Sequence, residues 1–86
     1  METDVQKIED LYDKNFKRNL KEVLAIRKCT MAQLCRDINI RRDALEHNIR
    51  YKKRPRFSVI YAITVALNCS IDDLISEELP DATTLP

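Results

Sequence analysis

Basic side chains are the residues of this chain best suited to chemistry with a ligand, and they gather in its middle. Residues 16–56 hold thirteen Lys or Arg and four Asp or Glu, which gives +9. Residues 1–15 hold two bases and five acids, and residues 57–86 hold five acids and no base. The formal net charge of +1 therefore conceals a strong partition. Clustered ammonium and guanidinium groups attract anions, so we expect one face of the molecule to meet a polyanion.

The densest basic stretch is YKKRPRF, residues 51–57. It has three possible interpretations, namely a solvated charge run, a nuclear-import patch, or a loop that grips phosphate groups. Pro55 stiffens the stretch, and the apolar residues that follow it at once favour a loop whose ends are held by the core. We therefore favour the phosphate grip, with Phe57 as its expected anchor.

Catalytic and metal chemistry have few candidate residues. His47 is the single histidine, and Cys29, Cys35 and Cys69 form no CxxC pair. Glycine is absent, which removes a candidate oxyanion loop. We therefore expect no catalytic residue, no metal site and no cofactor, and we interpret the thiols as reduced core residues.

Helices are predicted throughout the chain, because glycine is absent, proline is confined to three positions, and β-branched residues do not alternate. Thr30 and Ser70 are suitable N-caps, and Asn39 tolerates the left-handed conformation that ends a helix. The first helix is either continuous or broken near Asp13 or Asn15. We expect helices over about residues 4–28, 30–38, 42–50, 56–67 and 70–79.

The predicted helix over 42–50 has one apolar and one polar face. Its apolar side carries Ala44, Leu45 and Ile49, and helical spacing gathers its polar residues into a continuous stripe. Together with the short helix before it and the tight turn between them, this is a helix-turn-helix arrangement. An α-helix about 10–12 Å across fits the major groove of B-DNA, which is about 12 Å wide. The stripe consists of Arg42, Asp43, Glu46, His47 and Arg50.

The stretch TMAQLCRDINIRRDALEHNI resembles the helix-turn-helix of the lambda-repressor-like, Cro/CI-type (Xre) family. KKRPRFSVIYAITVALNCSIDDLI is similar to that family's next segment, and the likeness extends over about residues 16–76. The resemblance implies an all-α fold of five helices. This chain departs from the family pattern at Met31, where Gln is frequent, and at Arg41, where Ser or Thr is usual. The DNA sequence that it binds therefore cannot be inferred by analogy.

The resemblance also implies roles for individual residues. It places Arg41, Arg42, Asp43 and His47 at base-facing positions, and Lys53, Arg54 and Arg56 at positions that meet phosphates. From the stripe and the loop we add Glu46 to the base contacts, and Arg50 and Lys52 to the phosphate contacts. A blander alternative stays open, since Arg42, Glu46 and Arg50 are spaced to form ion pairs on a solvated helix.

Two further expectations concern packing. The helix over 56–67 is apolar nearly all round, so we expect it to be central and buried on most sides. Its Tyr61–Val65 side is either core or a dimer seam, and we favour core. Pro80 stops the last helix, whose inner face includes Ile71 and Leu79, and residues 80–86 are expected to be a frayed tail.

These inferences predict three regions, namely an acidic N-terminal helical extension (1–15), a helix-turn-helix DNA-binding domain (16–79) and a C-terminal tail (80–86). The expected function is sequence-specific binding of double-stranded DNA by a small transcriptional regulator, a repressor acting as a homodimer on a palindromic site. The alternative is an antitoxin-like or antirepressor-like adaptor that binds a protein partner through the acidic N-terminus or the tail. We expect that the protein is not an enzyme and does not bind a membrane. Its expected location is the cytoplasm, and a nuclear location stays open as the alternative.

Overall fold

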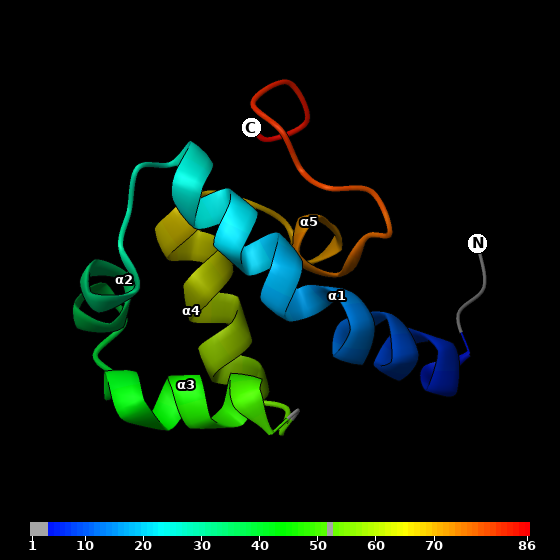
Figure 1. Ribbon diagram of the computed structural model, residues 1–86, viewed down its shortest axis with the longest axis horizontal. Helices are drawn as coiled ribbons and strands as arrows, with labels where there is room; N and C mark the ends of the chain where they lie inside the picture. The colour runs from blue at the N-terminus through cyan, green and yellow to red at the C-terminus, as the bar shows by residue number, and fades with distance from the viewer. Residues whose placement is uncertain (1–3, 52) are drawn as a thin grey trace.

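The computed structural model describes residues 4–51 and 53–86, and these residues form five α-helices and no strand (Figure 1). The predicted all-α fold with five helices is confirmed. Helix α1 crosses the front of the molecule, α2 and α3 lie to one side and below it, and α5 is behind it. The helices are α1 (Val5–Ile26), α2 (Met31–Asp37), α3 (Arg42–Arg50), α4 (Phe57–Leu67) and α5 (Ile71–Ile75).

Helix α1 is continuous, so the possible break near Asp13 or Asn15 does not occur. Its N-cap is Asp4, whose carboxylate accepts a hydrogen bond from the Gln6 amide at 2.8 Å. Asn15, instead of capping a helix, is fully buried and donates to the Ile75 carbonyl at 2.9 Å. The acidic N-terminal extension and the start of the bundle are therefore one helix.

Residues with a left-handed backbone conformation lie at the C-terminal ends of three helices, although the chain has no glycine. Lys28, Asn39 and Asn68 have φ values of 56°, 55° and 50°. After Asn39, the Ile40 amide donates to the Cys35 carbonyl at 3.0 Å, which closes the end of α2. The prediction for Asn39 is confirmed, and so is Thr30 as the N-cap of α2, since its hydroxyl accepts from the Gln33 amide at 3.1 Å. These two local signals set the tight turn of the helix-turn-helix.

The core draws at least one fully or almost fully buried side chain from each helix. Helix α5 enters it after a capping box, in which the Ser70 hydroxyl and the Asp73 carboxylate each accept from the other's backbone amide. The most deeply buried apolar side chains are Leu20, Val23, Leu34, Leu45, Ile63 and Leu74.

Helix α4 is not buried on most sides, which corrects the expectation from its composition. Only Ile63 and Leu67 are buried, whereas Phe57, Tyr61 and Val65 are 79%, 60% and 64% exposed. The preference for core on the Tyr61–Val65 side is therefore wrong, and Phe57 does not anchor the basic loop. Ile63 and Leu67 turn to the core, and the opposite apolar face of α4 stays open to solvent.

The end of the chain also differs from the expectation. Helix α5 ends at Ile75, four residues early, because side chains of α1 take up the carbonyls that follow. Asn19 donates to the carbonyl of Ser76 at 2.8 Å, and Ile71 and Leu79 are 44% and 50% exposed rather than internal. Leu79 therefore lies beyond the helix, and Ile71, its first residue, is partly open to solvent.

Residues 80–86 do not form a frayed tail. The Leu85 side chain is only 7% exposed, and the Asp81 carboxylate accepts hydrogen bonds from the amides of Thr83 and Thr84. The Arg27 guanidinium donates to the Pro86 carbonyl at 2.9 Å, and also to the Leu67 carbonyl at the end of α4. The segment therefore packs back on the bundle.

Candidate nucleic-acid interface

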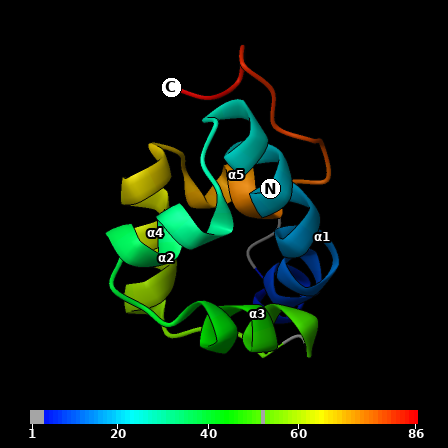
Figure 2. The same ribbon diagram turned by 60° about the vertical axis from the view of Figure 1, so that its left-hand side comes forward.

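Helix α3 presents the predicted base-contacting residues on its outer side. Leu45 fixes the orientation of the helix, since its side chain is fully buried beneath it. The helix lies along one edge of the molecule in both views, with α2 before it and the basic loop after it (Figures 1 and 2). All five residues, namely Arg41, Arg42, Asp43, Glu46 and His47, are exposed to solvent.

Two ion pairs order this face. The Arg42 guanidinium meets the Glu46 carboxylate at 2.9 Å, one helical turn away, and Arg41 meets Asp43 at 3.0 Å. Both pairs are well exposed, so each contributes only about 0.2–1 kcal/mol and can be exchanged for contacts with a ligand. The alternative interpretation, an ion pair on a solvated helix, is therefore correct for Arg42 and Glu46 in the free protein. A weak ion pair is compatible with a role in binding.

The His47 and Tyr51 rings lie 4.7 Å apart, centroid to centroid, at the C-terminal end of α3. His47 is exposed, and its ring is tilted by 48° against that of Tyr51. Its imidazole therefore faces the same solvent as the arginines of the stripe.

The basic loop after α3 is divided between exposed and engaged residues. Lys53 and Arg56 are exposed, as is Arg50 at the end of α3. Arg54 instead turns toward α1, where its guanidinium donates to Asp13 at 2.8 Å and lies 3.4 Å from Glu9. Lys52, predicted to contact phosphate, lies outside the described residues.

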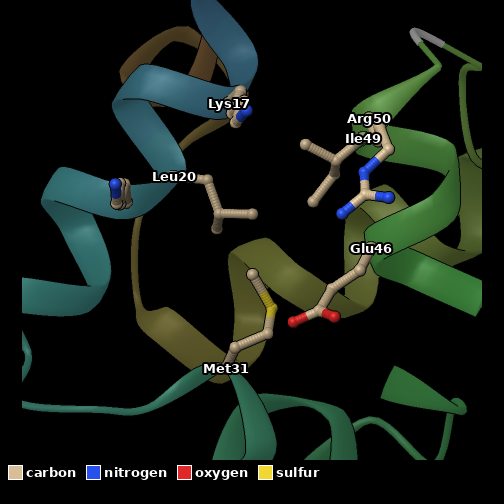
Figure 3. Close-up of a pocket in the computed structure, with 7 residues that line it drawn as sticks. Lys17, Leu20, Met31, Glu46, Ile49 and Arg50 are labelled. Carbon is tan, nitrogen blue, oxygen red and sulfur yellow. The ribbon is translucent and has the colours of Figure 1, made fainter. Parts of the chain in front are cut away.

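A shallow hollow of about 300 Å³ opens beside α3, between α1, the start of α2 and α3. Figure 3 shows Leu20, Ile49 and Met31 converging on it, with Lys17 on one wall and Arg50 and Glu46 on the opposite wall. Lys21 also lines it. Three cations and one carboxylate surround an apolar floor, so the edge of the hollow next to α3 is basic.

Sequence reasoning missed Lys17 and Lys21, because the first helix was judged by its acidic N-terminal part. The sequence does contain a signal for these two residues. Basic residues are more frequent in the C-terminal half of α1, and Lys17 and Lys21 are one turn apart on the same side of the helix. Their position next to α3 depends on how α1 packs against α3, which the spacing alone does not show.

Two cysteine thiols hold their protons more tightly than a free thiol does. Burial raises the pKa of the Cys69 thiol to about 11, with the Asp73 carboxylate as a smaller cause, and burial also raises the pKa of Cys35. Both thiols therefore stay neutral at physiological pH. Over residues 4–51 and 53–86, no cluster of His, Cys, Asp or Glu has the arrangement to hold a metal ion. In the same part of the chain, no helix is long and apolar enough to cross a membrane.

Comparison with known proteins agrees with this geometry. A family model described as a Cro/C1-type HTH DNA-binding domain matches residues 19–78, which include the end of α1 and helices α2 to α5. Neither the curated proteins nor the solved structures gave a significant match. The family match covers well over half of the chain and confirms the resemblance inferred from its motifs. The chain therefore belongs to the Cro/C1-type HTH DNA-binding domain family.

Proposed function

We propose that this DNA-binding protein recognises a specific double-stranded site through α3 and acts as a small transcriptional repressor. The observation that carries the proposal is the division of α3 into a fully buried Leu45 and an exposed stripe of charged residues and one histidine. A helix held in this way can present its exposed side chains to a major groove without first having to fold. The family membership supports DNA binding, and the stripe supports sequence readout.

Base recognition would rest mainly on Arg42. Guanidinium groups bind guanine O6 and N7 with two hydrogen bonds, and Glu46 holds this guanidinium beside the helix before DNA arrives. Once Arg42 turns to a base, the Glu46 carboxylate is free to accept from a cytosine amino group. Arg41, Asp43 and His47 complete the proposed set of base contacts.

Phosphate contacts would fix the register of α3 in the groove. Lys53, Arg56 and Arg50 are exposed along the loop and the helix end, and we assign them to one side of the groove. Lys17 and Lys21 line the same hollow as Arg50, from the side of α1, and are suited to further phosphates near it. Arg54 would act mainly by holding the loop on α1, because its guanidinium is already engaged.

Binding would take place as a homodimer on a palindromic site. Helix-turn-helix dimers place two recognition helices in successive major grooves about 34–36 Å apart on one face of the duplex. The symmetry of the protein then appears in the DNA as two inverted half-sites, about one helical turn apart.

Selection from a library of randomised duplex DNA tests the proposal. We expect enrichment of one motif composed of two inverted half-sites. Absence of any enriched motif would reject sequence-specific binding. If, in addition, the protein were recovered from its native host in a stable complex with another protein, an adaptor of the same fold would be the better explanation.

A further inference from the structure

Another hollow lies on the outer side of α3, at its C-terminal end. Its volume is about 270 Å³, and it is lined by Asp43, Glu46, His47, Arg50 and Tyr51. Four of these residues belong to the proposed DNA interface, and Tyr51 is the fifth. We infer that Tyr51 is a further specificity-determining residue, whose ring contacts the methyl group of a thymine in the major groove. The inference rests on the proposed function and adds one base contact to it.

Tyr51 continues the exposed stripe of α3 by one turn. Asp43, His47 and Tyr51 follow one another at four-residue spacing, which places them in one row along the helix. The Tyr51 amide donates to the His47 carbonyl at 3.0 Å, so the helical hydrogen bonding extends to this C-cap residue. The Tyr51 side chain is 59% exposed, and its ring centroid lies 4.7 Å from that of His47. A base pair that meets His47 therefore lies beside Tyr51 as well.

The charges around the hollow favour the edge of a base over a phosphate group. Asp43 and Glu46 bring two carboxylates to it, whereas Arg41 and Arg42, which pair with these carboxylates, do not line it. A phosphate in the hollow would meet like charge, but the amino group of a base can donate a hydrogen bond to a carboxylate. Arg50 also lines the hollow of Figure 3, so it lies at the boundary between the two and stays suited to a phosphate.

An A·T pair offers the groups that fit this hollow. In the major groove it presents the N6 amino group of adenine, which can donate to a carboxylate, and the C5 methyl group of thymine, which makes apolar contacts. The rings of Tyr51 and His47, tilted by 48° to each other, supply apolar surface for such a methyl group. A G·C pair also offers an amino group, but it has no methyl group for the rings to contact. The exposed ring of Tyr51 therefore favours an A·T pair at this position.

Replacing the thymines of one selected half-site by deoxyuridine, one at a time, removes only the methyl group and tests the inference. Fluorescence anisotropy at fixed salt gives the dissociation constants. For the wild type we expect one position at which the replacement weakens binding about fourfold, the factor that corresponds to one buried methyl group. Tyr51→Ala should bind the thymine and deoxyuridine duplexes equally, whereas Tyr51→Phe, which keeps the ring, should retain the fourfold ratio.

The matched control is Tyr61→Ala. Tyr61 is 60% exposed and also lies beside an aromatic ring, that of Phe57 at 6.0 Å, but it belongs to α4 and does not line the hollow. Its fourfold ratio should therefore be that of the wild type. Both tyrosines are exposed, so circular dichroism should show that all three variants are folded.

A selected half-site without thymine would overturn the inference, and so would a wild type that prefers the selected duplex but is indifferent to every thymine methyl group. Either result leaves the proposed function standing. A fourfold ratio that Tyr51→Ala retains would also overturn the inference, because the methyl contact would then belong to another residue. A wild type that binds the selected duplex and a scrambled duplex equally would contradict the proposed function itself, and the inference with it.

Discussion

The Arg54 guanidinium donates a hydrogen bond to the Asp13 carboxylate across 2.8 Å and thereby joins the basic loop to α1. The second carboxylate near this guanidinium is that of Glu9, at 3.4 Å. The acidic N-terminal part of α1 thus acts on the loop from within the same chain. It takes up one of the loop's charges and leaves Lys53 and Arg56 exposed for a ligand.

Lys53 and Arg54 should behave differently in DNA binding, although they are adjacent. Lys53→Ala should reduce the slope of log K against log salt by about one unit, because one phosphate contact is lost. Arg54→Ala should weaken binding through a less ordered loop and leave the slope nearly unchanged. Fluorescence anisotropy over a range of salt concentrations measures both quantities. An unaltered slope for Lys53→Ala would remove this residue from the phosphate contacts.

Lys17 should contribute to DNA binding, whereas Lys14 should not. Lys17 lines the hollow beside α3, while the Lys14 ammonium group lies 3.0 Å from the Glu77 carboxylate near the end of α5. Lys17→Ala should therefore lower both the affinity and the salt slope, the latter by about one unit, and Lys14→Ala should change neither. The same anisotropy titrations apply. Equal effects of the two substitutions would indicate a general charge effect and would contradict a contact at Lys17.

Arg42 should contribute to specificity as well as affinity. Arg42→Ala should cost roughly 1–3 kcal/mol on the selected site and relax the preference at one base pair. The measurement is a binding titration against a set of duplexes that differ at each position of the half-site. A loss of the same size on every duplex, including unrelated ones, would show that Arg42 contacts only the backbone.

Cys69 should make the stability of the fold depend on alkaline pH. Burial raises the pKa of its thiol from the ordinary 9.0 to about 11, so the folded state holds the proton more tightly than the unfolded state. The resulting stabilisation is complete below about pH 9 and is lost as the pH rises to about 11. Its size should be on the order of 1 kcal/mol, allowing for solvent screening of the half-exposed thiol.

Comparison with Cys69→Ala isolates this contribution, because every other side chain is the same in the two proteins. Urea unfolding at several pH values from 8 to 11, with reductant present, should show the difference in free energy of unfolding shrinking as the pH rises. A difference that stays constant over this range would mean that the thiol titrates normally in the folded protein.

The fold could be predicted from the sequence where the signals are local. Thr30, Asn39 and Ser70 mark helix boundaries through their own hydrogen bonds or backbone preference, and all three are placed as expected. The exposed stripe of α3 was also predictable, because its spacing separates it from Leu45.

The remaining features depend on contacts between distant parts of the chain. Apolar spacing along α4 is the same whether a face meets the core or another molecule, so it could not show that Tyr61 is exposed. The ion pairs of Arg54 join residues about forty positions apart. The burial of Leu85, the one leucine among residues 80–86, likewise depends on the surface against which it packs.

The most direct test of the central claim compares two duplexes of equal length and composition at physiological salt, one carrying the selected site and one a scrambled version. If α3 reads base sequence, the wild type should bind the selected duplex at least about 10³-fold more tightly. Equal dissociation constants for the two duplexes, with the same dependence on salt, would contradict sequence-specific recognition and leave only electrostatic attraction to the phosphate backbone.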